Sequence, residues 1–230
     1  MFREALTYPV RGENAEETLL VGAILALVTG LLVRLGVLAV LAVAPLVLLF
    51  GYALAVLRES AASDRVEAGE DAPPRFADPR ELAGNGVRAV VIAVGYLLVP
   101  VVALVVTVGG AVVGAGTRPA TIGTSAVVLG AGTVVLVVSL AFTYLLPAAL
   151  VAVARTGRLR SAVVPERLRR TVADARYFVG WVAALVVGSV AGLLVGALAS
   201  LGRPGEVVAL AVGFYAVVVV ARLLGRGIAE

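Results

Sequence analysis

The first long apolar stretch of the chain, residues 19–57, contains one charged residue, Arg34. As one straight helix this stretch would measure about 58 Å at about 1.5 Å per residue, nearly twice the ~30 Å hydrocarbon core of a bilayer. The stretch must therefore turn, and Arg34 and the nearby Gly36 mark the place. We expect two membrane spans here. The alternative is a first helix that continues to Ala44, followed by a re-entrant segment that begins at Pro45.

Composition extends this argument to the whole chain. Hydrophobic residues make up 61% of the sequence, which is above the usual share in soluble proteins. The sequence predicts an all-α protein, a polytopic membrane helical bundle in which six transmembrane helices form three hairpins. We expect a single integral membrane domain over residues 1–230. The expected spans are about residues 15–33, 36–57, 89–113, 125–154, 177–201 and 205–221.

Local patterns predict where several helices begin. Asn14, with Glu17 three residues later, forms a capping-box pattern that places the start of the first span near Ala15. Asp78, followed by a proline and then by an acid three residues on, predicts a short cytosolic helix before the third span. Short amphipathic helices are also expected before the other odd-numbered spans, within residues 2–11 and 166–176.

All 19 basic residues are arginines, and their distribution predicts the orientation of the chain. Sixteen of them lie in the N-terminal segment, in residues 58–88 and 155–176, and in the C-terminal tail. The three short turns hold one each, Arg34, Arg118 and Arg203. Because arginine-rich connections stay on the cytoplasmic side, we expect a cell-membrane protein with both termini in the cytoplasm. Residues 58–88 and 155–176 would then be cytosolic loops.

The basic run of residues 155–170 carries six arginines and one acid, which fits either a nucleic acid or an anionic membrane surface as partner. It lies between two apolar segments and contains neither interleaved aromatic residues nor a nucleic-acid-binding motif. We therefore expect membrane lipids as partners, with anionic headgroups at the cytosolic face, and no nucleic acid.

Small residues recur every four positions on three of the spans, and such strips let helix backbones approach closely. We expect these strips to form tight contacts within the bundle, with contacts between subunits as the alternative. The strips are Gly22, Ala26 and Gly30; Ala184, Gly188, Gly192, Gly196 and Ser200; and Gly205, Ala209 and Gly213.

The sequence offers few groups for catalysis. It has no cysteine and no histidine, which are the usual ligands of zinc and copper. No acidic residue lies deep inside an expected span, so proton-coupled transport is not expected. We expect no metal site, no cofactor and no enzyme activity. A path for a small solute would have to use the following residues: Arg34, Thr107, Thr143 and Pro147.

Aromatic residues near the ends of membrane spans are typical of anchors at the membrane interface. We expect this role for Tyr52, Tyr96, Tyr144, Tyr177, Trp181 and Tyr215. Prolines within the spans predict kinks, or broken helices of the kind that transporters use. These are Pro45, Pro100 and Pro147.

Two functional classes fit these features. The first is a noncatalytic scaffold or accessory component, with a membrane protein partner or a second copy of the chain on its glycine strips. The alternative is a transporter or channel for a small neutral or anionic solute.

Several segments carry a resemblance to a known family. They are the opening MFREALTYPVRGENAEETLLVG, the pairs Gly51-Tyr52 and Gly95-Tyr96, the segment PPRFADPRELAGNGVRAVV and the segment ARYFVGWVAAL. Together they resemble domain of unknown function 4013, a family of multi-pass membrane proteins from archaea and bacteria, and this chain is similar to haloarchaeal members. The resemblance implies location and architecture, and it implies no activity and no functional residue.

Overall fold

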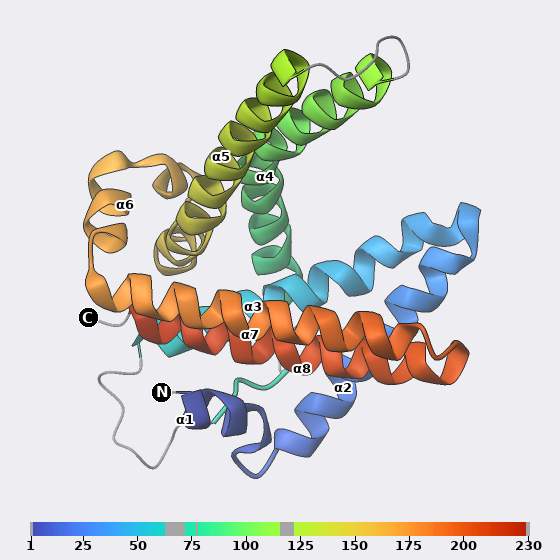
Figure 1. Cartoon of the computed structure of the whole chain (residues 1–230). Helices are drawn as coiled ribbons and strands as arrows, with labels where there is room; N and C mark the ends of the chain where they lie inside the picture. The colour runs from blue at the N-terminus through green and yellow to red at the C-terminus, as the bar shows by residue number, and fades with distance from the viewer. Residues whose placement is uncertain (1, 63–71, 77, 116–121, 229–230) are drawn as a thin grey trace.

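The computed structural model describes residues 2–62, 72–76, 78–115 and 122–228, and these form eight α-helices joined by turns and short 3₁₀ segments (Figure 1). The α-helices are α1 (Phe2–Thr7), α2 (Ala15–Arg34), α3 (Val43–Ala62), α4 (Pro79–Ala115), α5 (Ile122–Thr156), α6 (Pro165–Val172), α7 (Ala175–Ala199) and α8 (Arg203–Ile228). The 3₁₀ segments are η1 (Tyr8–Val10), η2 (Gly36–Ala42) and η4 (Leu159–Val163).

Six helical segments are long and apolar enough to cross a membrane: α2, η2 and α3 from Ala39, α4 to Gly110, α5 from Leu129, α7 and α8. The prediction of an all-α protein with six such helices is confirmed, and no described residue lies in a β-strand. At 37 and 35 residues, α4 and α5 exceed the roughly 20 residues that a span requires. They must therefore tilt or extend beyond the hydrocarbon core.

The turn in the first apolar stretch lies at Arg34, so the first helix does not continue to Ala44. α2 ends at Arg34, and Gly36 follows with φ +61°, a left-handed conformation that favours glycine. The chain then winds as η2 until α3 begins at Val43. Pro45 lies in the first turn of α3, where its missing amide interrupts no helical hydrogen bond. The proline therefore belongs to the start of a helix and not to a re-entrant segment.

α4 begins as predicted but includes no separate short helix. The Asp78 carboxylate accepts hydrogen bonds from the backbone amides of Arg80 (2.8 Å) and Glu81 (3.4 Å), which caps the helix. From Pro79 the helix continues without a break into the membrane-spanning part. The expected short cytosolic helix thus forms the first turns of α4, because no proline follows within these turns to interrupt the helical hydrogen bonds.

The prediction that the first span begins near Ala15 is confirmed, but the capping hydrogen bond expected from Asn14 is not formed. The Asn14 amide faces the guanidinium group of Arg75 instead. A contact with a residue distant in sequence therefore replaces the helix cap that the local pattern predicted for Asn14.

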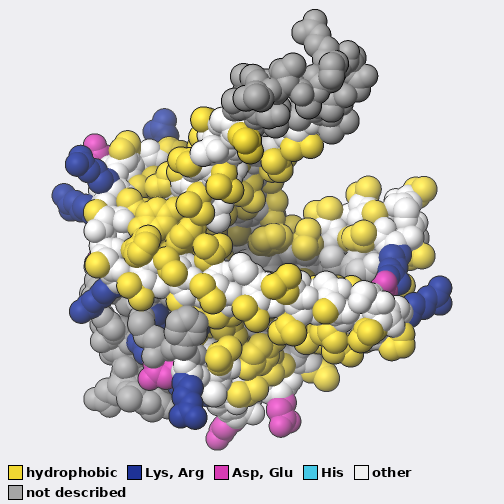
Figure 2. Space-filling view, in the orientation of Figure 1, with side chains coloured by type: hydrophobic (Ala, Val, Ile, Leu, Met, Phe, Trp, Pro, Cys, Tyr) yellow, Lys and Arg dark blue, Asp and Glu magenta, His cyan; other side chains and the backbone are white. Residues whose placement is uncertain are grey.

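The helices form a body and a hairpin that leans away from it (Figure 1). In the body, α8 packs against α7, α3 and α2. The hairpin consists of α4 and α5, which pack against each other, and it joins the body mainly through the contact of α4 with α3. Figure 2 shows a largely hydrophobic surface over α5, α7 and α8, as expected of helices that face lipid.

Most buried side chains gather at one end of the molecule, which we call the closed end. There the C-terminal parts of α3, α5 and α8 meet the N-terminal parts of α4 and α7 in shared apolar clusters. Tyr52, Val56, Tyr177 and Val218 are each exposed by 1% or less. α1 also packs against α8 at this end. The opposite end, where α2 turns into η2 and α7 into α8, is the open end.

Candidate functional site

Towards the open end, parts of three helices have no buried residue. These are residues 101–110 of α4, 129–137 of α5 and 190–199 of α7, and we call them the open half. They are apolar or small apart from two threonines. In Figure 2 an opening separates the hairpin from the body, and α3 and η2 form the body side of this opening (Figure 1). Because exposed apolar surface of this extent requires lipid or another protein as neighbour, the open half is the candidate interaction site.

The small-residue strip of α2 faces α8 of the same chain. A β-carbon at Gly22 would overlap the Phe214 ring, and one at Gly30 would lie 2.7 Å from Cδ1 of Leu210. Ala26, between the two glycines, is buried. The strip therefore makes room for large side chains of α8.

The strip of α8 faces α7. A β-carbon at Gly205 would overlap the carbonyl oxygen of Leu198, and Ala209 is buried. The contact loosens at Gly213, where the nearest atom, Cγ2 of Val195, would be 3.9 Å from an added β-carbon. The closest approach of α8 to α7 at the open end is thus at the start of α8.

The strip of α7 is covered over only part of its length. Ala184 is buried, and at Gly188 an added β-carbon would be 3.8 Å from Val220, an ordinary contact. At Gly192 and Gly196 an added β-carbon would have no described neighbour within 4 Å. Ser200 is exposed, and its hydroxyl donates a hydrogen bond to the Ala197 carbonyl of the same helix. The three residues Gly192, Gly196 and Ser200, which we call the free strip, lie in or directly after the open half.

Other close helix contacts use glycines that the four-residue spacing did not identify. Between α3 and α4, a β-carbon at Gly51 would overlap the Leu82 carbonyl, and one at Gly86 would overlap the Val47 carbonyl. Between α7 and α8, the Cα atom of Gly227 would lie 2.9 Å from a β-carbon at Gly180. Each of these glycines lies against a glycine or a backbone carbonyl of another helix. A spacing pattern within one helix carries no signal for such pairs.

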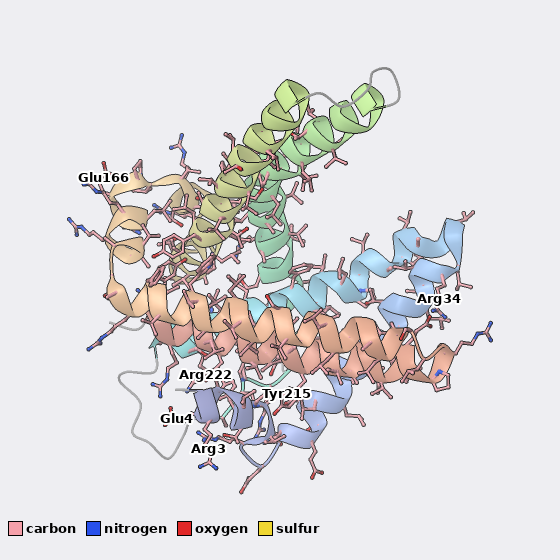
Figure 3. All side chains as sticks on the ribbon, viewed as in Figure 1. Arg3, Glu4, Arg34, Glu166, Tyr215 and Arg222 are labelled. Atoms are coloured by element: carbon pink, nitrogen blue, oxygen red, sulfur yellow. The ribbon has the colours of Figure 1, made fainter. Side chains whose placement is uncertain are left out.

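The structure does not bring the predicted solute-path residues together. Arg34 forms an ion pair with Glu206 at the open end, where Figure 3 shows it beside the start of α8. Thr107 lies on α4, in the open half, whereas Thr143 and Pro147 lie on α5, nearer the closed end. None of the four residues lines the cavity of about 720 Å³ beside α4 and α5.

The hydroxyl groups in the spans bond to their own helices. The Thr29 hydroxyl donates to the Leu25 carbonyl (2.7 Å), and the Thr143 hydroxyl donates to the Ser139 carbonyl (2.8 Å). Thr133 on α5 makes the same contact four residues back. Hydroxyl protons that are used within a helix do not provide donors to a passing solute. Among the described residues, no group of three or more Asp, Glu, His or Cys side chains could hold a metal ion.

Pro147 instead marks a contact between α5 and α7. A proline has no amide hydrogen, so the carbonyl of Thr143, four residues earlier, loses its helical donor. The indole Nε1 of Trp181 donates a hydrogen bond to this carbonyl (3.3 Å). One turn further, the Tyr177 hydroxyl donates to the carbonyl of Tyr144. Trp181 therefore satisfies the carbonyl that the proline leaves without a donor, and Tyr177 adds a second hydrogen bond between α7 and α5.

The aromatic residues are mostly held inside the protein and not at its lipid-facing surface. Tyr52 and Tyr177 are each 1% exposed, so the prediction of interface anchors is wrong for both. The Tyr52 ring stacks on Phe76, with centroids 4.2 Å apart, and its hydroxyl has no hydrogen-bond partner among the described residues. Tyr8 lies beneath the guanidinium of the buried Arg222, which also donates to a serine hydroxyl on α3 (3.2 Å). These contacts close the bundle at its arginine-rich end.

Comparison with known proteins gives one match. The model of a family described as "Protein of unknown function (DUF4013)" matches residues 34–200. No curated protein and no solved structure matches the chain significantly. The matched segment includes four of the six apolar helical segments in full.

Proposed function

The chain belongs to the DUF4013 family of proteins of unknown function, and from this premise and the geometry above we propose that it is a noncatalytic scaffold or accessory component of a membrane. Its role is to bind a transmembrane helix of a partner protein in the open half. The free strip of α7 allows that helix to approach closely, and residues 101–110 and 129–137 of the hairpin offer further exposed apolar surface.

The observation that carries this proposal is the contrast between the two ends. The closed end buries its large side chains, whereas no residue of the open half is buried. Lipid tails provide no hydrophobic drive for helix association, so strips of small residues in membranes serve close packing. The strips of α2 and α8 are covered by this chain. The free strip has the same composition and no described neighbour, which supports a helix of another protein as its partner.

The contacts of the solute-path residues do not favour a transporter. Arg34 is paired with Glu206, and the Thr143 hydroxyl donates to the Ser139 carbonyl of its own helix. We further propose that the arginine-rich closed end faces the cytoplasm of the cell, because arginine resists transfer across the membrane.

Photo-cross-linking in native membranes tests the proposal. A benzophenone side chain replaces Leu104 of α4 or Leu193 of α7, which are 52% and 75% exposed in the open half. We expect a protein adduct of one defined mass at both positions. The control is Leu20 of α2, which is 62% exposed outside the open half and should cross-link to lipid only.

A second variant tests whether the protein that forms the adduct binds at the free strip. Replacing Gly192 and Gly196 together by leucine places side chains in open space, so the chain should still fold. The adduct at Leu193 should then disappear. Adducts with lipid alone at both test positions would contradict the proposal, and solute flux in proteoliposomes of the purified protein would support the transporter instead.

A further inference from the structure

The segment that connects α5 to α7 separates its apolar and its basic side chains onto two faces. α5 ends before Gly157, which has φ +67°, and the chain continues through η4 and α6. Leu168 and Val172 of α6 pack against the apolar core. The arginines of α6 are exposed, at positions 167, 169 and 170. The connection is therefore an amphipathic element at the closed end, where the spans leave the membrane.

The apolar face of this element encloses a groove together with α4 and α5. The groove is the cavity of about 720 Å³ mentioned above, a volume within the range of ligand pockets. The Tyr96 hydroxyl of α4 donates to the Ala162 carbonyl of η4 (2.5 Å), which holds the two walls together. Apart from one arginine, the lining is apolar or aromatic. It includes Ile92, Gly95, Phe142, Leu145, Val163 and Leu168.

Arg169 is the one charged residue that lines the groove. It is exposed and has no carboxylate within ion-pair distance in the described part of the chain. No acidic residue lines the groove. An occupant thus meets a hydrocarbon-like wall and a single guanidinium, which prefers a phosphate oxygen as its acceptor.

Arg167, two residues earlier on α6, lines two different hollows on the other side of the helix. One of them also contains Arg158 and Arg160 beside the hydroxyls of Thr156 and Ser161. The same short helix therefore carries one arginine at the groove and another away from it. Substituting each of the two arginines in turn can therefore distinguish binding in the groove from general electrostatic attraction to an anionic membrane surface.

We propose that the groove binds an acyl chain of an anionic phospholipid whose phosphate lies against Arg169. The position at the membrane surface places the headgroup at the level of the guanidinium and the chain along the apolar lining. The site is independent of the partner helix in the open half, because none of its lining residues belongs to that region.

Native mass spectrometry of the detergent-purified full chain tests the proposal, with dioleoyl phosphatidylglycerol and dioleoyl phosphatidylcholine as probes. We expect tighter binding of the anionic lipid. Arg169→Ala should weaken it about five- to tenfold, the size expected for one arginine at an anionic headgroup. Arg167→Ala, which removes the same charge from the other face, should leave the affinity unchanged.

A second experiment tests the proposal by filling the groove with a larger side chain. A β-carbon at Gly95 meets open space, so Gly95→Leu should fold and should weaken binding of both lipids. Gly84→Leu, also in open space on α4 but outside both the groove and the open half, is the matched control. Equal losses from Arg167→Ala and Arg169→Ala would overturn the proposal, as would unchanged binding in Gly95→Leu. Competition by inorganic phosphate as strong as that by lipid would show a free-anion site and would also overturn it.

Discussion

A proline inside a membrane helix leaves the carbonyl four residues before it without its backbone donor, and in hydrocarbon that loss is costly. Here Pro147 exposes the Thr143 carbonyl and Trp181 supplies the donor from α7. The two residues lie on different helices and are far apart in sequence. Their pairing explains why the one tryptophan of the chain is buried at 7% exposure.

Trp181→Phe tests this pairing because it keeps an aromatic ring and removes the indole donor. We expect the free energy of unfolding to fall by about 0.5–2 kcal/mol, the range of hydrogen bonds between membrane helices. The measurement is the unfolding midpoint in an SDS titration followed by circular dichroism.

The same substitution in a Pro147→Ala background is the control. An alanine at position 147 returns an amide donor to the Thr143 carbonyl, so Trp181→Phe should then cost less. Equal losses in both backgrounds would show that Trp181 acts through packing alone.

At the scale of elements, α3 and α4 cross so closely that backbone meets backbone. The crossing depends on Gly51 and Gly86, each facing a carbonyl of the other helix. It also joins the hairpin to the body, since α4 makes its main contact with the body at α3. A change in this crossing should therefore alter the position of the whole hairpin.

Gly86→Ala should destabilise the protein by about 1–3 kcal/mol, because the added methyl group would overlap the Val47 carbonyl and push the helices apart. Gly84→Ala, two residues earlier on α4, adds the same methyl group in open space. It should be neutral or stabilise the helix by up to about 1 kcal/mol. Thermal unfolding of both variants in detergent compares them directly. A similar loss in both would contradict the close crossing.

For the whole molecule, the closed end and the open end differ in packing and in charge. The described parts of the arginine-rich segments lie at the closed end, together with α1 and the C-terminal part of α8 (Figure 3). The open end holds Arg34 and Arg203. This arrangement predicts that both termini lie on one side of the membrane and that the turns between α2 and α3 and between α7 and α8 lie on the other.

Reporter fusions test the orientation. Fusions after Glu70, Pro165 and Glu230 should report the cytoplasm, because the arginine-rich connections resist translocation. Fusions after Arg118 and Arg203 should report the opposite side. An activity reporter and a fluorescence reporter with opposite sidedness control for expression. The same location for Glu70 and Arg118 would refute the topology.

The sequence by itself determined six helices long and apolar enough to cross a membrane and the position of the first turn. Both are consequences of local chemistry, because an apolar run of a given length must cross or turn, and Arg34 with Gly36 cannot continue a lipid-facing helix easily. The start of α4 at Pro79 follows from its Asp78 cap in the same local way. The predicted short helix before it was wrong because nothing local separates its turns from the span.

Only the tertiary structure decided which helix faces are covered. The same small-residue spacing is packed at Gly22 and uncovered at Gly192, since the rotation and crossing of each helix depend on residues far away in sequence. The Gly51–Gly86 crossing and the Trp181 bond to Thr143 pair residues of different helices, so no periodicity within one helix reports them. For the same reason the open half was not predicted, because it results from how the hairpin leans and not from any single span.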